Sequence, residues 1–576
     1  MQRMTRASIH GSQLLLCLLA LLAMLLSGCG SSGAGGPQLD PDQVFTWPII
    51  GTTQFSDLVL DPANVTDYPS ATVIDAIYGG LVTSDHNLNV VPDMATWDVS
   101  PDGRQYTFHL NSNLHFSDGA SITAQDFAYS LDRALDPNVC GKPGCNPVAG
   151  TYLSDIKGAA DRLSGNSTTI IGTGVIAPDA LTLIINLDKP VAYFLEALTY
   201  PTSFPVEKSL VNKYGNDWTQ HLNEGGCSGP FLIKSYGDGK ALTLTPNPYW
   251  YGKTKLTLKE IVRPYVKDPD TAYAAYRQGQ YDYTDVPTDE YQAARDQEDF
   301  HQVGLLQTNY VGMNLDYGPL KDLRVRQALA LALNKQLIAD RVLNGAQLPT
   351  NHIVPEGMPG FDDALTAPGS DTRTLTGDIT QAQKLLNSYY ADCKCGSSLA
   401  LTLTYPDTPD RARTAEAMKN IWETVLPGVQ ITINALPTLH DLVVNLLTKT
   451  AGNHEGALQM WLIGWIADYP DPQDWLSLQF APNSPLNFSN YQDGEQDGHD
   501  FTAWNILQKA DVEQDPSQRM NLYNEAEQQL VDDVAWLPYA QPLGIWRLRT
   551  YIQGYNPSAL NLMSDQDWAN VFVLAH

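Results

Sequence analysis

Residues 399–433 carry the pattern that most constrains the fold, a strand, a helix and a second strand in direct succession. Residues 399–404 alternate apolar and polar side chains, and residues 429–433 repeat this alternation. Between them, residues 409–425 have the spacing of an amphipathic helix. A crossover of this length joins parallel strands, so the segment predicts a βαβ unit and an α/β fold.

A further buried strand is predicted at residues 457–467, where an apolar run too short to span a membrane is flanked by turn formers. Asp468 follows this strand directly. Ligands of open α/β sheets gather beyond the carboxyl ends of strands, so Asp468 is a candidate ligand contact. The alternative is that it caps the turn at Tyr469 and Pro470. Asp471 lies between two prolines, which is typical turn chemistry.

Trp461 and Trp465 are four residues apart, so both side chains leave the predicted strand on the same side. We expect Trp461 to pack in the core and Trp465, nearer the strand end, to reach a cleft.

Two helices and a hairpin are also predicted from local signals. Asp322 can cap a helix with an apolar face, and a second helical stretch after Lys335 ends near residues 344–345. In the N-terminal half, Asp102-Gly103 predicts a hairpin turn, and Thr123 with Asp126 resembles a capping box. Arg324 and Arg326 lie on the first helix. They could bind a ligand carboxylate, but a solvated or structural role is favoured.

The first 28 residues have the composition of a targeting segment. Arg3 and Arg6 precede an apolar stretch of 13 residues at 14–26, short of the roughly 20 that a spanning helix needs. Leu-Ser-Gly-Cys at residues 26–29 resembles a bacterial lipobox, which predicts cleavage before Cys29 and its lipidation. The alternatives are an ordinary signal peptide or a short anchor helix. The Gly- and Ser-rich residues that follow predict a flexible tether.

Charge and motifs exclude several functions. The net charge is −29, and removal of residues 1–28, with two arginines and no acidic residue, makes it −31. Such a chain lacks the basic face that nucleic acid requires. It has no nucleophile elbow, zinc-protease motif, P-loop or dinucleotide fingerprint. We therefore expect no cofactor and no catalysis.

Five cysteines remain in the mature chain, Cys140, Cys145, Cys227, Cys393 and Cys395. In an oxidising compartment Cys140 and Cys145 could close a small loop, so they are a possible disulfide. Cys393 and Cys395 are too close in sequence to predict a bridge, and Cys227 is left over. None of the pairs has zinc spacing or a nearby histidine, so we expect no metal site.

An ordered series of motifs covers nearly the whole mature chain. It comprises Leu60-Asp61-Pro62-Ala63, Tyr78-Gly-Gly-Leu81-Val82, Trp97-Asp-Val-Ser-Pro-Asp102-Gly103, Phe116-Ser-Asp118-Gly119, Ser228-Gly229-Pro230-Phe231, Asn247-Pro248-Tyr249-Trp250, Leu323-Arg324-Val325-Arg326-Gln327-Ala328, and Asp515 followed by Arg519, Tyr523 and Ala526. In this order and spacing the chain resembles the family-5 extracellular solute-binding proteins. These are the oligopeptide- and dipeptide-binding receptors of ABC importers.

The resemblance implies an α/β, two-lobed periplasmic-binding-protein-like fold of type II, in the large three-subdomain variety with a hinged ligand cleft. The borders that we expect are a lipoprotein signal peptide at 1–28, a tether at 29–40, lobe I at 41–84, 216–306 and 541–576, an additional subdomain of lobe I at 85–215, and lobe II at 307–540.

The resemblance also implies a binding site. In the oligopeptide-binding relatives a Gly-Trp-x-Ala-Asp segment lies at the cleft, and its Asp pairs with the α-ammonium of the peptide. Carried over, Asp468 is this carboxylate, residues 464–467 provide backbone for β-pairing with the peptide, and Trp465 flanks it. The expected contacts are Asp468, Trp465, Gly464, Ala467 and Tyr469. Tyr152, Trp250 and Tyr251 are weaker candidates.

The expected function is that of a monomeric, lipid-anchored binding protein outside the cytoplasmic membrane. It would capture peptides and deliver them to an ABC permease. The family also includes receptors for sugars or metal chelates, which remain alternative ligands, and a tethered hydrolase is the competing class. The Cys140–Cys145 insertion and the acidic residues 493–500 depart from the family pattern and could reshape the cleft rim.

Overall fold

The computed structural model describes residues 38–141, 147–236, 239–393, 396–449, 456–482, 484–492, 494–496 and 499–576. The chain forms two compact units. One contains residues up to Pro41 together with Leu574–His576, and in it Leu39 and Leu574 form an isolated β-bridge. The other, Asp42–Val573, contains the helices and sheets described below. The predicted signal peptide and Cys29 lie outside the described residues.

A five-stranded sheet forms the first core of the large unit. Its strands follow the order β1 (Val44–Thr46), β11 (Glu260–Val266), β10 (Ala241–Pro246) and β9 (Phe231–Ser235), and β2 (Ile49–Ile50) also pairs with β11. Helix α2 (Tyr68–Ile77) contributes Val73, Ile74 and Ile77 to this core. Asp67 caps the helix, because its carboxylate accepts from the backbone N–H of Ser70 at 2.9 Å.

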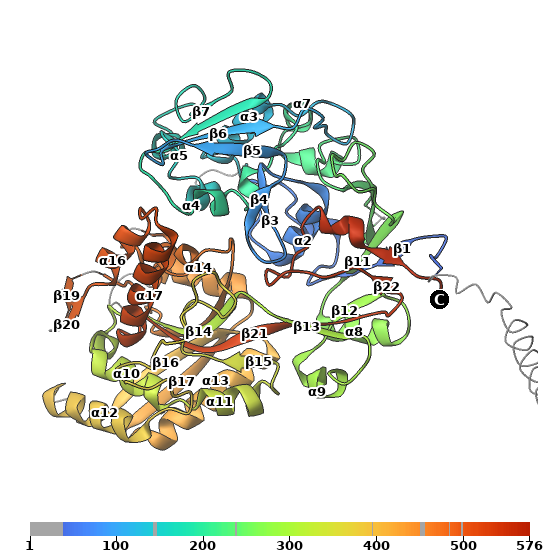
Figure 1. Cartoon of the computed structure of the whole chain (residues 1–576). Helices are drawn as coiled ribbons and strands as arrows, with labels where there is room; N and C mark the ends of the chain where they lie inside the picture. The colour runs from blue at the N-terminus through green and yellow to red at the C-terminus, as the bar shows by residue number, and fades with distance from the viewer. Residues whose placement is uncertain are drawn as a thin grey trace, which may run out of the picture. The chain divides into compact units, whose positions relative to one another are not determined.

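A four-stranded antiparallel sheet forms the second core, in the order β5 (Ala95–Val99), β6 (Gln105–Leu110), β8 (Thr182–Asn186) and β7 (Val175–Ile176). The predicted hairpin joins β5 and β6, and Gly103 takes the left-handed conformation there with φ 68°. Helix α3 (Ala124–Ala134) lies beside this sheet (Figure 1) and begins with the predicted capping box of Thr123 and Asp126.

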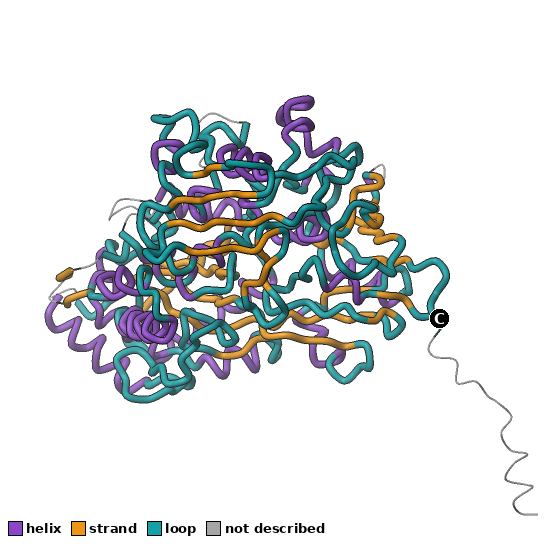
Figure 2. The backbone as a smooth tube through the Cα atoms, turned by 45° about the horizontal axis from the view of Figure 1, so that its top comes forward, coloured by secondary structure: helices purple, strands orange, loops and turns teal. Residues whose placement is uncertain are grey.

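An eight-stranded sheet forms the third and largest core. Its order is β12 (Tyr283–Asp285), β21 (Trp536–Leu548), β14 (Gln307–Met313), β18 (Met460–Ile466), β16 (Leu399–Pro406) and β17 (Val429–Leu436), with β13 (Phe300–Gly304) and β15 (Gln347–Pro349) also paired to β21. Strand β16 is parallel to both β17 and β18, and α13 (Pro409–Val425) crosses over between β16 and β17. Figure 2 shows the strands in orange and the helices around them in purple. The predicted βαβ unit and the strand before Asp468 are therefore confirmed.

The helices around this sheet also follow the predicted signals. Asp322 caps α10 (Leu323–Ala332), with its carboxylate accepting from the N–H of Arg324 at 2.9 Å. The second helical stretch consists of α11 (Lys335–Leu337) and a π-helical turn (Ile338–Val342), and it ends at Asn344 and Gly345 with positive φ. The other long helices are α12 (Ile379–Cys393), α14 (Leu439–Lys449), α16 (Ala503–Ala510) and α17 (Pro516–Asp532).

The remaining elements are short. They are η1 (Phe55–Asp57), β3 (Val82–Ser84), β4 (Val90–Pro92), α4 (Ala149–Tyr152), α5 (Ala159–Leu163), α6 (Phe194–Ala197), η2 (Pro201–Ser203), α7 (Lys208–Tyr214), η3 (Gly215–His221), α8 (Pro269–Arg277), η5 (Thr288–Glu290), α9 (Tyr291–Ala294), η6 (Gly318–Lys321), η8 (Pro472–Asp474), α15 (Ser477–Phe480), β19 (Gly494–Gln496), β20 (His499–Phe501), β22 (Ile552–Gln553), η9 (Asp567–Asn570) and β23 (Phe572–Val573). Among the described residues no helix has the length and apolar composition needed to cross a membrane.

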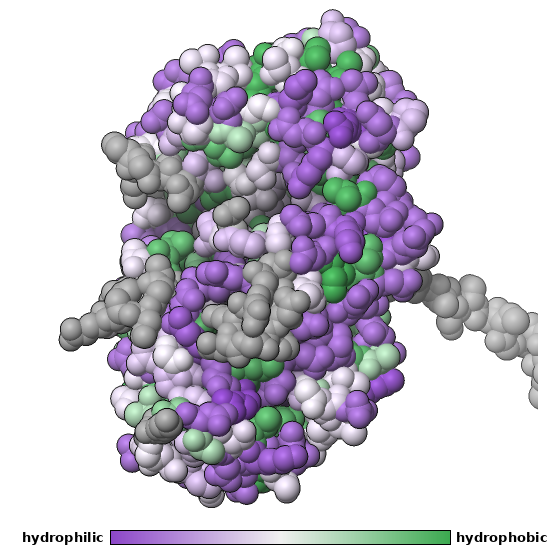
Figure 3. All heavy atoms as spheres, turned by 90° about the vertical axis from the view of Figure 1, so that its left-hand side faces the viewer, coloured by the Kyte–Doolittle hydropathy of each residue, from purple (hydrophilic) through white to green (hydrophobic). Residues whose placement is uncertain are grey.

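Strand β21 belongs to two cores. Trp536 and Leu537 near its start pack in the core of the eight-stranded sheet, whereas Trp546 and Leu548 near its end pack in the core of the five-stranded sheet. The strand therefore runs without a break across the border that we predicted between residues 540 and 541. The face seen in Figure 3 is mostly hydrophilic, with small separated hydrophobic groups, as the high net charge leads us to expect.

Candidate ligand-binding site

The end of β18 offers a backbone edge beside Asp468. On one side β18 pairs with β14 along its whole length, and Ala467 then donates to the carbonyl oxygen of Leu306 at 2.8 Å. On its other side, within the described part of the chain, β18 pairs with β16 only at Met460 and Trp461. Residues 463–466 thus have an edge without a paired strand, which is the arrangement that an extended ligand can join.

The Asp468 carboxylate lies at the end of this edge. Its Oδ2 accepts a hydrogen bond from the hydroxyl of Tyr152 at 2.7 Å, although the two residues are 316 positions apart in the sequence. Burial raises the pKa of Asp468 to about 7, and the hydrogen bond from Tyr152 partly opposes this shift. Among the described residues no basic side chain forms an ion pair with it. Asp468 is thus a half-buried carboxyl without a counter-ion among the described residues.

The turn after β18 is held by other carboxylates. Asp474 accepts from the backbone N–H of Asp468 at 3.1 Å, and Asp471 accepts from the N–H of Gln473 at 2.9 Å. Asp471 therefore performs the turn chemistry that the sequence predicts, and it also forms a buried ion pair with Arg519 that the sequence analysis did not predict. The Asp468 carboxylate itself accepts from Tyr152 and not from the turn.

Asp474 connects the turn to Trp465. Its Oδ2 also accepts from the indole Nε1 of Trp465 at 3.2 Å, and its side chain is fully buried. Burial and, next, the charge of Asp468 raise the pKa of Asp474 well above the usual range of a carboxyl group. Asp474 was not singled out from the sequence, although it lies only six residues after Asp468.

A cavity of about 170 Å³ borders the Asp468 side of this segment. Ile466, Ala467 and Asp468 form part of its wall. The other walls come from α2 and the residues before it, from the loop around η2, and from the C-terminal part of the chain. The lining residues on these walls include Asp67, Tyr68, Asp75, Tyr200, Phe204 and Met563.

Two of the five expected contacts, Asp468 and Ala467, line this cavity, and three do not. Trp465 is half-buried and turned to Asp474. Tyr469 is 1% exposed, its hydroxyl donates to Gln473, and its ring stacks with Tyr193. Gly464 lies opposite Asn309 of β14, and a Cβ there would collide with the Asn309 amide, so packing explains this glycine.

The remaining aromatic candidates are mostly structural. Trp461 is fully buried, as predicted. The hydroxyl of Tyr251 lies 2.6 Å from carboxylates of both Asp93 and Asp565, and its ring packs beside Trp250. Tyr152 is the exception, because it contacts Asp468 and stacks on Tyr200 with ring centroids 4.0 Å apart.

The two candidate arginines have structural partners. Arg324 pairs with Asp322 at 2.7 Å and with Asp392 at 2.5 Å. Arg326 is fully buried and donates to the backbone oxygens of Leu320 and Asp533 at 2.8 and 2.9 Å. The structural role favoured from the sequence is confirmed for both.

The described cysteines differ in whether they form disulfide bonds. Cys140 is disulfide-bonded, and its predicted partner Cys145 lies outside the described residues. Cys393 is also disulfide-bonded, which the sequence analysis did not predict, and Cys395 is likewise outside the described residues. Cys227 is free and buried, and burial raises its pKa to about 12.

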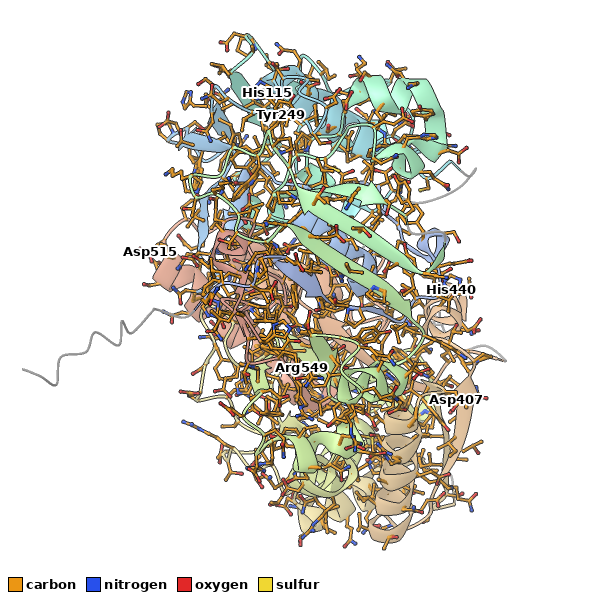
Figure 4. The ribbon with its side chains drawn as sticks, turned by 90° about the vertical axis from the view of Figure 1, so that its right-hand side faces the viewer. His115, Tyr249, Asp407, His440, Asp515 and Arg549 are labelled. Atoms are coloured by element: carbon orange, nitrogen blue, oxygen red, sulfur yellow. The ribbon has the colours of Figure 1, made fainter. Side chains whose placement is uncertain are left out.

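No cluster of metal-ligating side chains is found in the part of the chain that the structure describes. Groups of three or more His, Cys, Asp and Glu that could hold a metal ion are absent from these residues. His115 lies beside Tyr249, with ring centroids 6.0 Å apart, and His440 lies in a different region (Figure 4). The acidic insertion at 493–500 forms in part the short strands β19 and β20, and three of its residues are outside the described ranges.

Comparison with known families decides the class of the protein. Residues 89–486 match the model of the bacterial extracellular solute-binding proteins, family 5. The chain belongs to this family. Its members bind solutes and are not enzymes, so the hydrolase alternative is excluded.

Individual relatives agree with this assignment. The periplasmic oligopeptide-binding protein OppA of Escherichia coli K12 is 28% identical over 528 residues, covering 90% of this chain and 91% of that protein. The probable deoxycholate-binding periplasmic protein YgiS of the same organism is 29% identical over 528 residues, with the same coverage. The solved structure of the E. coli murein tripeptide-binding protein MppA is 25% identical, with a TM-score of 0.75, covering 93% of this chain and all of that one. The fold is thus the expected two-lobed α/β fold of type II.

Sequence reasoning missed most of the cavity wall. Tyr200 and Phe204 come from a loop without a readable motif. Asp75 could have been found, because it is the single charged residue of α2.

Proposed function

We propose that this protein captures short peptides with a free amino terminus and delivers them to an ABC permease. The observation that carries the proposal is the half-buried Asp468 carboxyl, which lines a cavity and lacks a counter-ion among the described residues. An α-ammonium group placed there would supply a positive charge beside the carboxyl group. It would thereby stabilise the ionised carboxylate, which burial disfavours. The free edge of residues 463–466 would pair with the peptide backbone and give affinity independent of its side chains.

The ligand would act by shifting a conformational equilibrium. The cavity wall combines residues after β18 of the eight-stranded sheet with residues of α2 from the core of the five-stranded sheet. A ligand that contacts both sets stabilises the arrangement in which they approach one another. This arrangement would be the one that the permease recognises. Anchoring through a lipidated Cys29, a monomeric state and a location on the outer face of the cytoplasmic membrane belong to the same proposal.

The charge of the cavity argues against an anionic ligand. Its described lining residues include three aspartates and no lysine, arginine or histidine. A bile acid such as the ligand in the name of YgiS carries a carboxylate, which these aspartates would repel. A peptide bound through its amino terminus instead places a positively charged ammonium group beside these aspartates.

The proposal is tested by mass spectrometry of the ligand released from purified, denatured protein, together with titration of tri-alanine into the wild type and Asp468→Asn. We expect released peptides, and at least tenfold weaker binding of tri-alanine by the variant. Asp371→Asn, at an exposed position, is the control for the change in net charge and should bind like the wild type. Recovery of sugars or chelates alone, or equal binding by N-acetylated tri-alanine, would overturn the peptide assignment.

A further inference from the structure

The cavity at Asp468 is also lined by the carboxyl group of Asp75. Asp75 lies in a helix, so the rule of strand ends that indicated Asp468 does not indicate Asp75. Asp75 lies in the third turn of α2, is half-buried and forms part of the cavity wall. Helix α2 packs in the core of the five-stranded sheet, whereas Asp468 follows a strand of the eight-stranded sheet. The two carboxyl groups therefore reach one cavity from two different cores.

Among the described residues, neither group has a cation to balance it. Asp75, like Asp468, forms no ion pair with any described residue. Burial, and next the charge of Asp565, raise the pKa of Asp75 well above the usual range. The third aspartate of the wall, Asp67, already caps α2. Arg263 donates to Thr72 on the same helix, but it stacks on Trp47 and lines a separate cavity.

The rest of the wall also suits a cation. Three aromatic rings, those of Tyr68, Tyr200 and Phe204, border the same space. The faces of such rings attract ammonium and guanidinium groups, most strongly where water is excluded. Several apolar side chains complete the wall, among them Ile74 and Met563. A weakly polar surrounding strengthens each charge pair that forms inside it.

Resting on the proposed function, we infer that the cavity selects ligands with two cationic groups, namely peptides whose first residue is lysine or arginine. The α-ammonium pairs with Asp468, and the side-chain cation of the same residue pairs with Asp75 between the aromatic rings. Each cation contacts a carboxylate from a different core, so this ligand holds both sides of the cavity together. A free diamine has the same two charges and is the second possible source.

The first test needs no variant. Calorimetric titration compares Lys-Ala-Ala with norleucyl-Ala-Ala, which has a similar side-chain length without the charge. We expect the wild type to bind the lysyl peptide at least tenfold more tightly. Equal affinity for the two peptides would overturn the inference while leaving the proposed function intact, whereas no binding of either peptide would defeat the proposed function itself.

The second test assigns the preference to Asp75. Asp75→Asn should bring the lysyl peptide down to the affinity of the norleucyl peptide and change tri-alanine binding less than twofold. Asp468→Asn should weaken the binding of all three peptides. A preference for lysine that survives in Asp75→Asn would overturn the role of Asp75. Binding of 1,5-diaminopentane as tightly as Lys-Ala-Ala, lost in Asp75→Asn, would support the two-cation site and identify the diamine as the source.

Discussion

The affinity for a neutral peptide such as tri-alanine is expected to fall as the pH drops from 8 to 5. Burial holds the pKa of Asp468 at about 7 in the unliganded protein, against an ordinary value of 3.8. The peptide ammonium binds the ionised carboxylate, so a proton must leave before the ligand can pair. Because the folded pKa is raised, ionisation is complete only above pH 7, and protons compete with the ligand below it.

The size of the effect follows from this pKa. Each pH unit below 7 should weaken binding about tenfold, so pH 5 should cost about 100-fold, or about 2.7 kcal/mol at about 1.36 kcal/mol per unit. Above about pH 8 the peptide itself loses its charge, since an α-amino group titrates near this pH. A bell-shaped dependence with its maximum between these limits is therefore expected.

Isothermal titration calorimetry from pH 5 to 9 at constant ionic strength measures this dependence. Asp468→Asn should bind weakly and with little change between pH 5 and 7, because its amide does not titrate. A wild-type affinity that stays constant from pH 5 to 8 would refute the reasoning. The same would follow from an equal slope in the wild type and the variant, since another group would then be responsible.

Two further predictions concern the elements that hold the segment after β18 in place. Arg519→Met should destabilise the fold by about 3–5 kcal/mol, because it leaves the 2%-exposed Asp471 buried without its partner. Urea denaturation measures the loss, and addition of Asp471→Asn should recover most of it; an unchanged midpoint in the single variant would contradict this. Gly312→Ala should cost about 1–3 kcal/mol, because the new Cβ would collide with the fully buried indole of Trp461 on the neighbouring strand. Combination with Trp461→Phe should recover part of the loss in thermal denaturation, and equal melting temperatures for Gly312→Ala and the wild type would count against the collision.

Local patterns carried most of the fold predictions that the structure confirms. The βαβ unit at 399–436, the cap at Asp322 and the capping box at Thr123 each depend on residues close together in the sequence. Their hydrogen bonds and periodicity are complete within a single element or a pair of elements. The family resemblance supplied the two-lobed arrangement, which periodicity alone does not contain.

The site was only partly predictable, because its wall is assembled from distant segments. Asp468 was found from its place after a strand, but its partner Tyr152 comes from 316 residues earlier. Tyr469 shows the opposite case, a residue that was expected at the site but does not line the cavity. It is the immediate neighbour of Asp468, yet its ring turns into the core of the four-stranded sheet. Adjacency in a turn does not decide which space a side chain enters, and only the packing around it does.

The strand β21 has a consequence for how the two sides of the cavity can move. Its 13 residues, about 43 Å of extended chain, are anchored by buried tryptophans in two separate cores. A loop between the cores would let them swing freely, whereas a strand with paired neighbours resists bending and returns to its resting curvature. The lobe closure that we propose would therefore have to bend this strand, and release of the ligand would let the strand return toward its resting curvature.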